Sequence, residues 1–249
     1  MILGNSHPEC ALDDRLNVDF HNLSRSAEPL YYTHLKLKKI LEWNPHLSHV
    51  FVELTENQFE YRMQDWIWSR EAVQRHIKEL LFYLPLEYHY SAIGRHGLYY
   101  CIDFLLALKT NLVGLFTCKP EDFFDYVQWG GYTPRQGTYL GRNNKSEWNK
   151  SDEKLNPFPD NFKSIEQMIS LCDLKGAKIQ FIRCPVHPSQ PKHFEKAYQQ
   201  IVKENQKIQL LDFNNYPLED ECFFDAQHLN ETGARLFTAH FTTMLLSEN

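Results

Sequence analysis

A serine that follows a short apolar run near the start of the chain is the first candidate for chemistry. Residues 1–3 are apolar, Gly4 interrupts them, Ser6 follows, and an amphipathic stretch begins at Pro8. This pattern predicts a strand, a tight turn and a helix. Such a turn sets the Ser6 hydroxyl at the carboxyl edge of a sheet, where open α/β sheets bind ligands, and near a helix N-terminus, which favours negative charge. Ser6 is therefore a candidate nucleophile if a base reaches it; the alternative interpretation is an ordinary turn.

A matching base lies at the other end of the chain. Asp225 and His228 are three residues apart, in a segment that leads into an amphipathic C-terminal stretch. Asp225 can hold one imidazole nitrogen of His228 while the other nitrogen faces Ser6, which fixes the tautomer and stabilises the imidazolium. Taken singly, Asp225 reads as a turn residue and His228 as a loop histidine. Together with Ser6 they predict a Ser–His–Asp triad for acyl transfer.

The two ends together resemble the SGNH (GDSL-like) hydrolase family. Gly4-Asn5-Ser6 corresponds to its first block, Gly-Asp-Ser, and 225–228 to its last block, Asp-x-x-His. Ala27 stands where the family has a glycine after its second strand, and Asn57 matches the asparagine that follows its third strand. The chain departs from the family's residues at four positions, which are Asn5, Ala27, Thr55 and Gln58.

The resemblance implies where the oxyanion of an acyl transfer would be bound. The donors are the N–H of Ser6, the N–H of Ala27 and the side-chain amide of Asn57. Because alanine carries a methyl group that glycine lacks, we expect Ala27 to keep this role only with a negative φ.

The order of strand-like and helix-like stretches predicts a single three-layer α/β/α domain over residues 1–249. Strands are expected at 17–24, 49–54, 177–183 and 208–213, in addition to the first one, with helices between them. The resemblance implies a flavodoxin-like parallel sheet of about five strands. The expected helices cover 28–43, 63–84, a stretch that a capping box of Ser164 and Gln167 opens, 194–202 and 230–246.

Residues 85–160 interrupt this alternation, and we interpret them as an insertion that forms a lid or cap. Two helical pieces are expected inside it, at 98–116 and 120–128, followed by a stretch rich in aromatic residues. Trp129 and Arg135 from this stretch, with His7 and His187, are candidate substrate-binding residues, and the aromatic rings could stack on a sugar. The alternative interpretation is that the aromatic residues pack the lid and that His187 is a loop histidine.

The composition and net charge of the chain disfavour several classes of binding partner. The net charge of −6 argues against nucleic acid and against anionic membrane surfaces, which both require basic patches. The six cysteines contain no C-x-x-C pair, and the histidines form no His-x-x-x-His pair, so we expect neither a metal nor another cofactor. The apolar run at 98–116 contains Asp103 and Lys109 and is read as a buried or lid helix, not a membrane span.

The compartment and the oligomeric state are left open. No signal peptide is visible, which favours a cytoplasmic protein as the chain stands. The first strand is short, however, and suggests the hypothesis that the natural protein begins earlier, with an export signal or membrane anchor that has been removed. Membrane association is expected only in that case.

These observations favour a serine esterase or O-acyltransferase that acts on an acyl ester, most plausibly an acetyl ester, of a small molecule or a carbohydrate. The alternative is a catalytically inactive SGNH-fold binding protein, in which Ser6 and His228 lie beyond hydrogen-bonding distance. A flavodoxin-like phosphate or nucleotide binder is disfavoured because no glycine-rich loop follows a strand.

Overall fold

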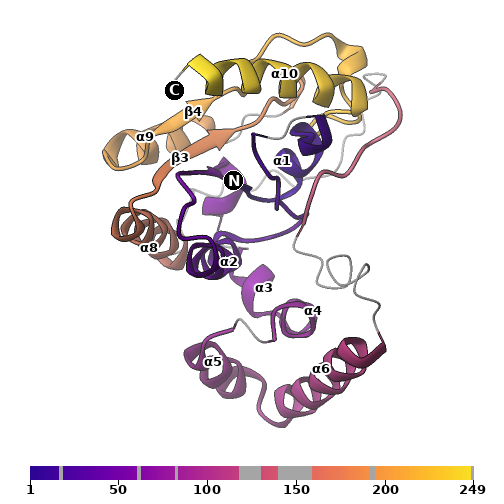
Figure 1. The fold of residues 1–249 in the computed structure, drawn as a ribbon, viewed down its shortest axis with the longest axis vertical. Coiled ribbons are helices and arrows are strands. Elements are labelled where there is room, and N and C mark those ends of the chain that lie inside the picture. Colours follow the sequence, from indigo (N-terminus) through magenta and orange to yellow (C-terminus); the bar gives the residue numbers. More distant parts are fainter. Residues whose placement is uncertain are drawn as a thin grey trace.

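A parallel four-stranded sheet forms the centre of the protein (Figure 1). The computed structural model describes residues 1–16, 19–60, 63–81, 84–117, 130–139, 159–190 and 194–247. The strands lie in the order β1-β2-β3-β4, and their bounds are Ile2–Leu3, His49–Glu53, Lys178–Arg183 and Leu210–Asp212. Phe51 pairs with Ile2 on one side and with Gln180 on the other, so the short β1 is in register with the sheet centre.

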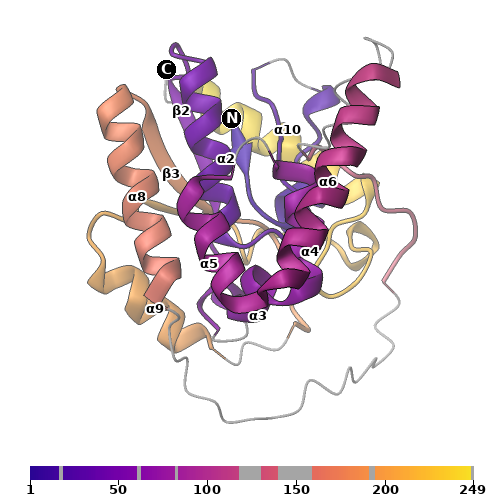
Figure 2. The ribbon, with the colours of Figure 1, turned by 90° about the horizontal axis from the view of Figure 1, so that it is seen from below.

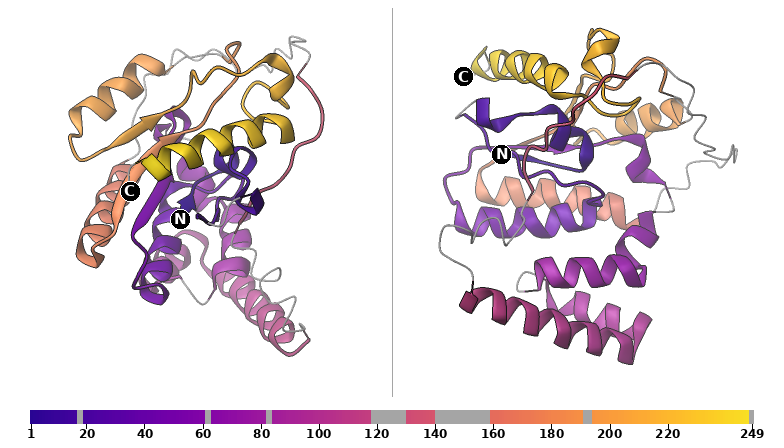
Figure 3. Two further views of the ribbon diagram at one scale, coloured as in Figure 1. Left: turned by 45° about the horizontal axis from the view of Figure 1, so that its top comes forward. Right: turned by 90° about the vertical axis from the view of Figure 1, so that its right-hand side faces the viewer.

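Helices cover both faces of the sheet, which confirms the three-layer α/β/α fold. Successive strand residues point to opposite faces, and Val50 and Val52 join one core while Phe51 joins the other. Helices α2 (Leu30–Trp43), α8 (Pro159–Lys175) and α9 (Glu195–Glu204) pack on the first face. Helices α1 (Ser6–Ala11) and α10 (Glu231–Ser247) pack on the second. Figure 3 shows these layers edge on in its right panel, with α10 in yellow.

The expected strand at 17–24 is reduced to a single parallel bridge. Ile2 donates its N–H to the carbonyl of His21 (2.8 Å) and accepts the N–H of Leu23 (2.9 Å), around the bridge from Ile2 to Asn22. The Asn22 side chain instead binds the carbonyls of Pro8 and Leu12. The segment therefore occupies the position of an edge strand beside β1, while its Asn22 side chain binds the helix that follows β1. With it, the spatial order matches a flavodoxin-like 2-1-3-4-5 sheet.

A second group of helices lies beyond α2, on the side away from the sheet (Figures 1 and 2). It comprises α3 (Met63–Trp68), α4 (Arg70–Leu80), α5 (Leu86–His96) and α6 (Leu98–Thr117). These helices share a hydrophobic core of their own, with Tyr32 and Leu35 of α2 at its border. The helix expected at 63–84 is broken at Ser69, whose hydroxyl accepts the Ala72 N–H (3.2 Å) and caps α4.

The expected insertion thus begins with ordered helices. Helix 98–116 is confirmed as α6, whereas α5 was not predicted, and the piece expected at 120–128 lies outside the described residues. Helix α8 begins at Pro159, so the predicted capping box at Ser164 is wrong: that serine is buried inside the helix. Gly176, at φ 72°, follows the end of α8. Of the helices in the described part of the chain, none combines the length and apolar character needed to cross a membrane.

Candidate active site

Ser6, His228 and Asp225 form a continuous chain of hydrogen bonds. His228 Nε2 lies 2.8 Å from Ser6 Oγ, and His228 Nδ1 lies 2.9 Å from Asp225 Oδ2 and 3.0 Å from Oδ1. Ser6 is the first residue of α1, and the other two residues lie in the loop that precedes α10. The structure therefore brings together the three residues that sequence spacing had selected, across 222 positions.

Asp225 is held in the ionised state that this arrangement needs. Its Oδ1 accepts the backbone N–H groups of Gln227 (2.7 Å) and His228 (2.9 Å). Burial alone would raise the pKa of Asp225, but the hydrogen bond and charge interaction with His228, and the two N–H groups, lower the pKa below its ordinary value. An ionised Asp225 fixes Nδ1 of His228 as the protonated nitrogen and leaves Nε2 to accept the Ser6 proton.

The turn that presents Ser6 is built by close approach between β1 and β2. A Cβ atom at Gly4 would lie 2.5 Å from the Cβ of Glu53 and 2.8 Å from Cγ of Pro8, so only glycine fits there. Asn5 is the N-cap of α1, and its side chain accepts the His7 N–H (3.1 Å). Asn5 thus supplies the oxygen that caps the N-terminus of α1.

Glu53 is a site residue that the sequence analysis missed. This fully buried carboxylate at the end of β2 accepts the Asn5 N–H (2.8 Å) with Oε2 and binds Nδ1 of His7 (2.6 Å) with Oε1. Glu53 therefore fixes the positions of the residues on both sides of Ser6. An acidic residue that ends a buried strand was the signal in the sequence, because an unpaired buried charge is costly.

His7 belongs to this anchor and also borders the triad. Its ring centroid lies 5.4 Å from that of His228. Burial alone would lower the pKa of His7, but the charge of Glu53 and its hydrogen bond outweigh burial and raise the pKa above its ordinary value. His7 also borders a small cavity that Asn57 and Gln227 line.

Ala27, one of the expected oxyanion donors, lies on a turn beside that of Ser6, and its backbone conformation differs from the expectation. Ala27 has φ 59°, in the left-handed region, where a negative φ was expected. Its turn lies beside the nucleophile turn because Arg25 donates its N–H to the carbonyl of Gly4 (2.9 Å). Within the described ranges, the N–H groups of Ser6 and Ala27 have no hydrogen-bond partner, which leaves them available to a ligand. Glycine would adopt this left-handed backbone more readily than alanine.

Asn57 lies in a short 3-10 helix (Glu56–Phe59) that follows β2. The Gln58 side chain accepts the Thr55 N–H (3.1 Å), and buried Arg183 binds Glu56 (2.9 Å), so both neighbours of Asn57 are fixed. Asn57 and His7 line a cavity of about 10 Å³, enough for about one water molecule. The substitutions at 55 and 58 thus form the turn that carries Asn57.

Residues 130–139 form a strap that joins the two ends of the chain. Thr133 donates its N–H to the Glu9 carbonyl (2.9 Å) of α1, and Tyr139 donates to the Phe223 carbonyl (2.7 Å). Arg135 Nε contacts Cys10 Sγ (3.4 Å), and its carbonyl accepts the Glu231 N–H (3.0 Å) at the start of α10. Arg135 therefore links α1, which carries Ser6, to the start of α10. The other candidate from this stretch, Trp129, lies outside the described residues.

His187 supports the loop that carries the base. Its Nε2 lies 3.1 Å from Asp220 Oδ1, its Nδ1 lies 2.7 Å from Ser189 Oγ, and its N–H bonds to the carbonyl of Ala226. Both ring nitrogens are therefore engaged within the chain. This geometry matches the loop-histidine interpretation of His187 more closely than direct substrate binding.

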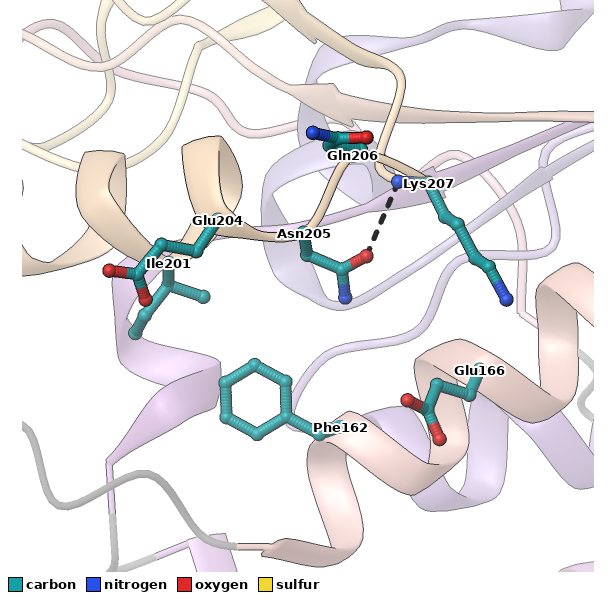
Figure 4. Close-up of a pocket in the computed structure, with 7 residues that line it drawn as sticks. All are labelled: Phe162, Glu166, Ile201, Glu204, Asn205, Gln206 and Lys207. Atoms are coloured by element: carbon teal, nitrogen blue, oxygen red, sulfur yellow. Dashed lines mark hydrogen bonds between the residues drawn. The ribbon is translucent and has the colours of Figure 1, made fainter.

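Other candidate chemistry in the described residues is weaker. Burial raises the pKa of the Cys10 thiol, one turn along α1 from Ser6, which disfavours a thiolate nucleophile. No group of three or more His, Cys, Asp or Glu residues is arranged to hold a metal ion in the part of the chain that the structure describes. An open groove of about 460 Å³ lies between α8 and α9 and contains no triad residue (Figure 4).

Comparison with known sequences adds one partial match. The model of an uncharacterised protein family matches residues 134–248. This region includes Asp225 and His228 but not Ser6, Ala27 or Asn57. No curated protein matches the chain.

Proposed function

We propose that this protein is a serine esterase or O-acyltransferase and a divergent member of the SGNH hydrolases. The observation that carries the proposal is the hydrogen-bonded chain from Ser6 Oγ through His228 to Asp225. The inactive binding protein predicted separation of Ser6 and His228, and their 2.8 Å contact favours the enzyme over that alternative.

In the proposed reaction, Ser6 Oγ attacks the carbonyl carbon of an ester while His228 Nε2 takes the hydroxyl proton. The tetrahedral intermediate then expels the alcohol, which receives that proton from His228, and an acyl group remains on Ser6. Water, or the hydroxyl of an acceptor, repeats the two steps and releases the acyl group. Hydrolysis and transfer thus differ only in the acceptor.

The charge that develops on the carbonyl oxygen would be bound by preset donors. The N–H groups of Ser6 and Ala27 lack partners among the described residues, and Asn57 lies on the cavity that His7 borders. Of the aromatic residues that could stack on a sugar, Tyr132 packs against Arg15 and Tyr139 against His187. Stacking would therefore fall to Trp129 and Trp148, which lie outside the described residues.

A fluorophosphonate, which phosphonylates activated serines, tests the proposal by intact-mass spectrometry. We expect one adduct on the wild type and none on Ser6→Ala. Ser189→Ala is the matched control, because Ser189 Oγ also lies 2.7 Å from a histidine nitrogen, that of His187, which contacts Asp220. This control should keep the adduct.

The base is tested by turnover of an acetyl ester. His228→Ala should lower kcat by on the order of a thousandfold while far-UV circular dichroism stays unchanged. A loss below about tenfold would exclude His228 as the base. No adduct on any variant, and no turnover by the wild type, would favour the binding-protein alternative.

A further inference from the structure

Helix α6 has an apolar outer face that the described part of the chain leaves open. Five large side chains on it are between 42% and 87% exposed: Leu98, Ile102, Leu105, Leu112 and Phe116. Flanking them are Tyr99, Leu106 and Val113, each at least 51% exposed. In Figure 3, right panel, α6 is the magenta helix at the bottom, farthest from α10. The patch therefore lies on the opposite side of the molecule from α10.

The outer residues follow the spacing of a helix–helix seam. Positions 98, 102, 105, 109, 112 and 116 alternate steps of four and three residues, which is the heptad rhythm of packed helices. Lys109 is the one polar member, and its aliphatic stem can lie along an apolar surface. The order of these spacings is the same from either end of the helix. The row of side chains can therefore pack against the same row of a second α6 that runs in the opposite direction.

The inner side of α6 packs against the other helices of its own chain. Tyr100, Phe104 and Ala107, two residues along from the outer positions, face the helical core of the subunit. Asp103 and Asn111 bind Gln74 (2.8 Å) and the Lys78 carbonyl (2.8 Å) of α4. A helix that is apolar on both sides is normally buried on both sides.

The open face is large enough for a stable dimer. Eight side chains of this size and exposure present on the order of 900 Å², compared with roughly 800 Å² per partner in a standard interface. Apolar patches on monomers rarely exceed roughly 600 Å². Helix α5 adds Leu86, Tyr90 and Ile93 at the same i, i+4, i+7 spacing.

We propose that α6 is a dimerisation helix that packs against α6 of a second copy of this chain around a two-fold axis. Closed two-fold pairing is the commonest arrangement of soluble oligomers and requires a self-complementary surface. A membrane surface is a poorer occupant, because the exposed cations of α5 and α6 are only Arg95 and Lys109 and the net charge is −6.

Sedimentation velocity on the full chain, from about 1 to 100 μM, tests this assignment. The wild type should sediment with twice the 29.6 kDa mass of one chain. The double variant Leu105→Glu/Leu112→Glu should sediment as a single chain with unchanged helical circular dichroism, because glutamate is a good helix former. Leu174→Glu is the matched control, since Leu174 is 80% exposed on α8, and it should remain a dimer.

Three outcomes would overturn the proposal. One is a dimer that survives the double substitution. Another is a monomeric wild type that floats with zwitterionic or anionic vesicles, which would make a membrane the occupant. The last is a monomeric wild type that ignores vesicles, which would mean that the chain covers this face itself. Ser6→Ala should dimerise like the wild type, so this result is independent of the proposed enzymatic function.

Discussion

At the residue scale, Ala27 combines a functional position with backbone strain. It is the one non-glycine residue with a positive φ in the described ranges, and it carries a proposed oxyanion donor. A left-handed conformation costs an L-residue roughly 1–2 kcal/mol, which the surrounding hydrogen bonds must offset. Arg75 contributes by donating to the Ala27 carbonyl (3.3 Å), and Arg25 ties the turn to Gly4.

Replacing Ala27 by glycine should therefore stabilise the protein. Glycine removes the strain but makes the unfolded chain more flexible, so we expect a net gain of up to about 1 kcal/mol in the free energy of unfolding. Urea denaturation measures it. The matched control is Ala239→Gly on the exposed side of α10, where the same change should cost about 1 kcal/mol. A loss of stability for Ala27→Gly would contradict the left-handed assignment.

The sequence analysis selected candidate residues by local pattern. Ser6, Asp225 and His228 were found because each belongs to a short block with a chemical meaning. Glu53 was missed because its partners, Asn5 and His7, are 48 and 46 positions away and no spacing joins them. The φ of Ala27 was predicted with the wrong sign because it is imposed by tertiary contacts.

At the scale of elements, β2 positions the nucleophile helix through the His7–Glu53 pair. The raised pKa of His7 means that the folded protein binds a proton more tightly than the unfolded chain, whose histidine titrates near roughly 6.5. The stabilisation from this pair is therefore complete below that pH and is lost as the pH rises through the folded pKa.

A pH series on His7→Gln tests this link. The wild type should exceed the variant in unfolding free energy at pH 6, and the difference should shrink towards pH 9. His46→Gln, at an exposed position, controls for the substitution itself. Urea titrations at several pH values provide the measurement, and a difference that grows towards pH 9 would refute the proposed protonation of His7.

Elements with strong periodicity were predicted well, whereas those shaped by long-range contacts were not. Strands β2 and β3 and helices α2, α6 and α10 lie within a few residues of their predicted bounds. The segment at 17–24 alternates like a strand, but Asn22 turns its side chain onto Pro8 and Leu12 and interrupts the ladder. Ser69 breaks a continuous helical pattern because its hydroxyl competes as a cap.

At the scale of the whole molecule, an aromatic cluster fastens the C-terminal helix to the rest of the protein. Phe241 is fully buried, and its ring contacts those of Phe20, Phe51 and Phe213. These rings come from the early loop, from β2 and from the segment after β4. Helix α10 follows directly on the loop of His228, so this cluster also holds the base in place.

Truncating the Phe241 side chain should lower the stability of the whole protein. Phe241→Ala should lower the free energy of unfolding by about 3–5 kcal/mol, because the side chain leaves a cavity in a packed core. Leu236→Ala, on the half-exposed side of the same helix, should change it by less than about 1 kcal/mol. Urea denaturation compares the two variants, and equal losses would show that α10 is not anchored through Phe241.

The 222 positions between Ser6 and His228 also have a consequence during synthesis. At roughly 5–20 residues per second, a ribosome makes the base roughly 10 to 45 seconds after the nucleophile. Throughout that interval Ser6 is an ordinary alcohol with no partner to take its proton. Under the proposed mechanism, a nascent or C-terminally truncated chain therefore has no activated serine. Reactivity of Ser6 would then show that α10 has packed against the rest of the protein.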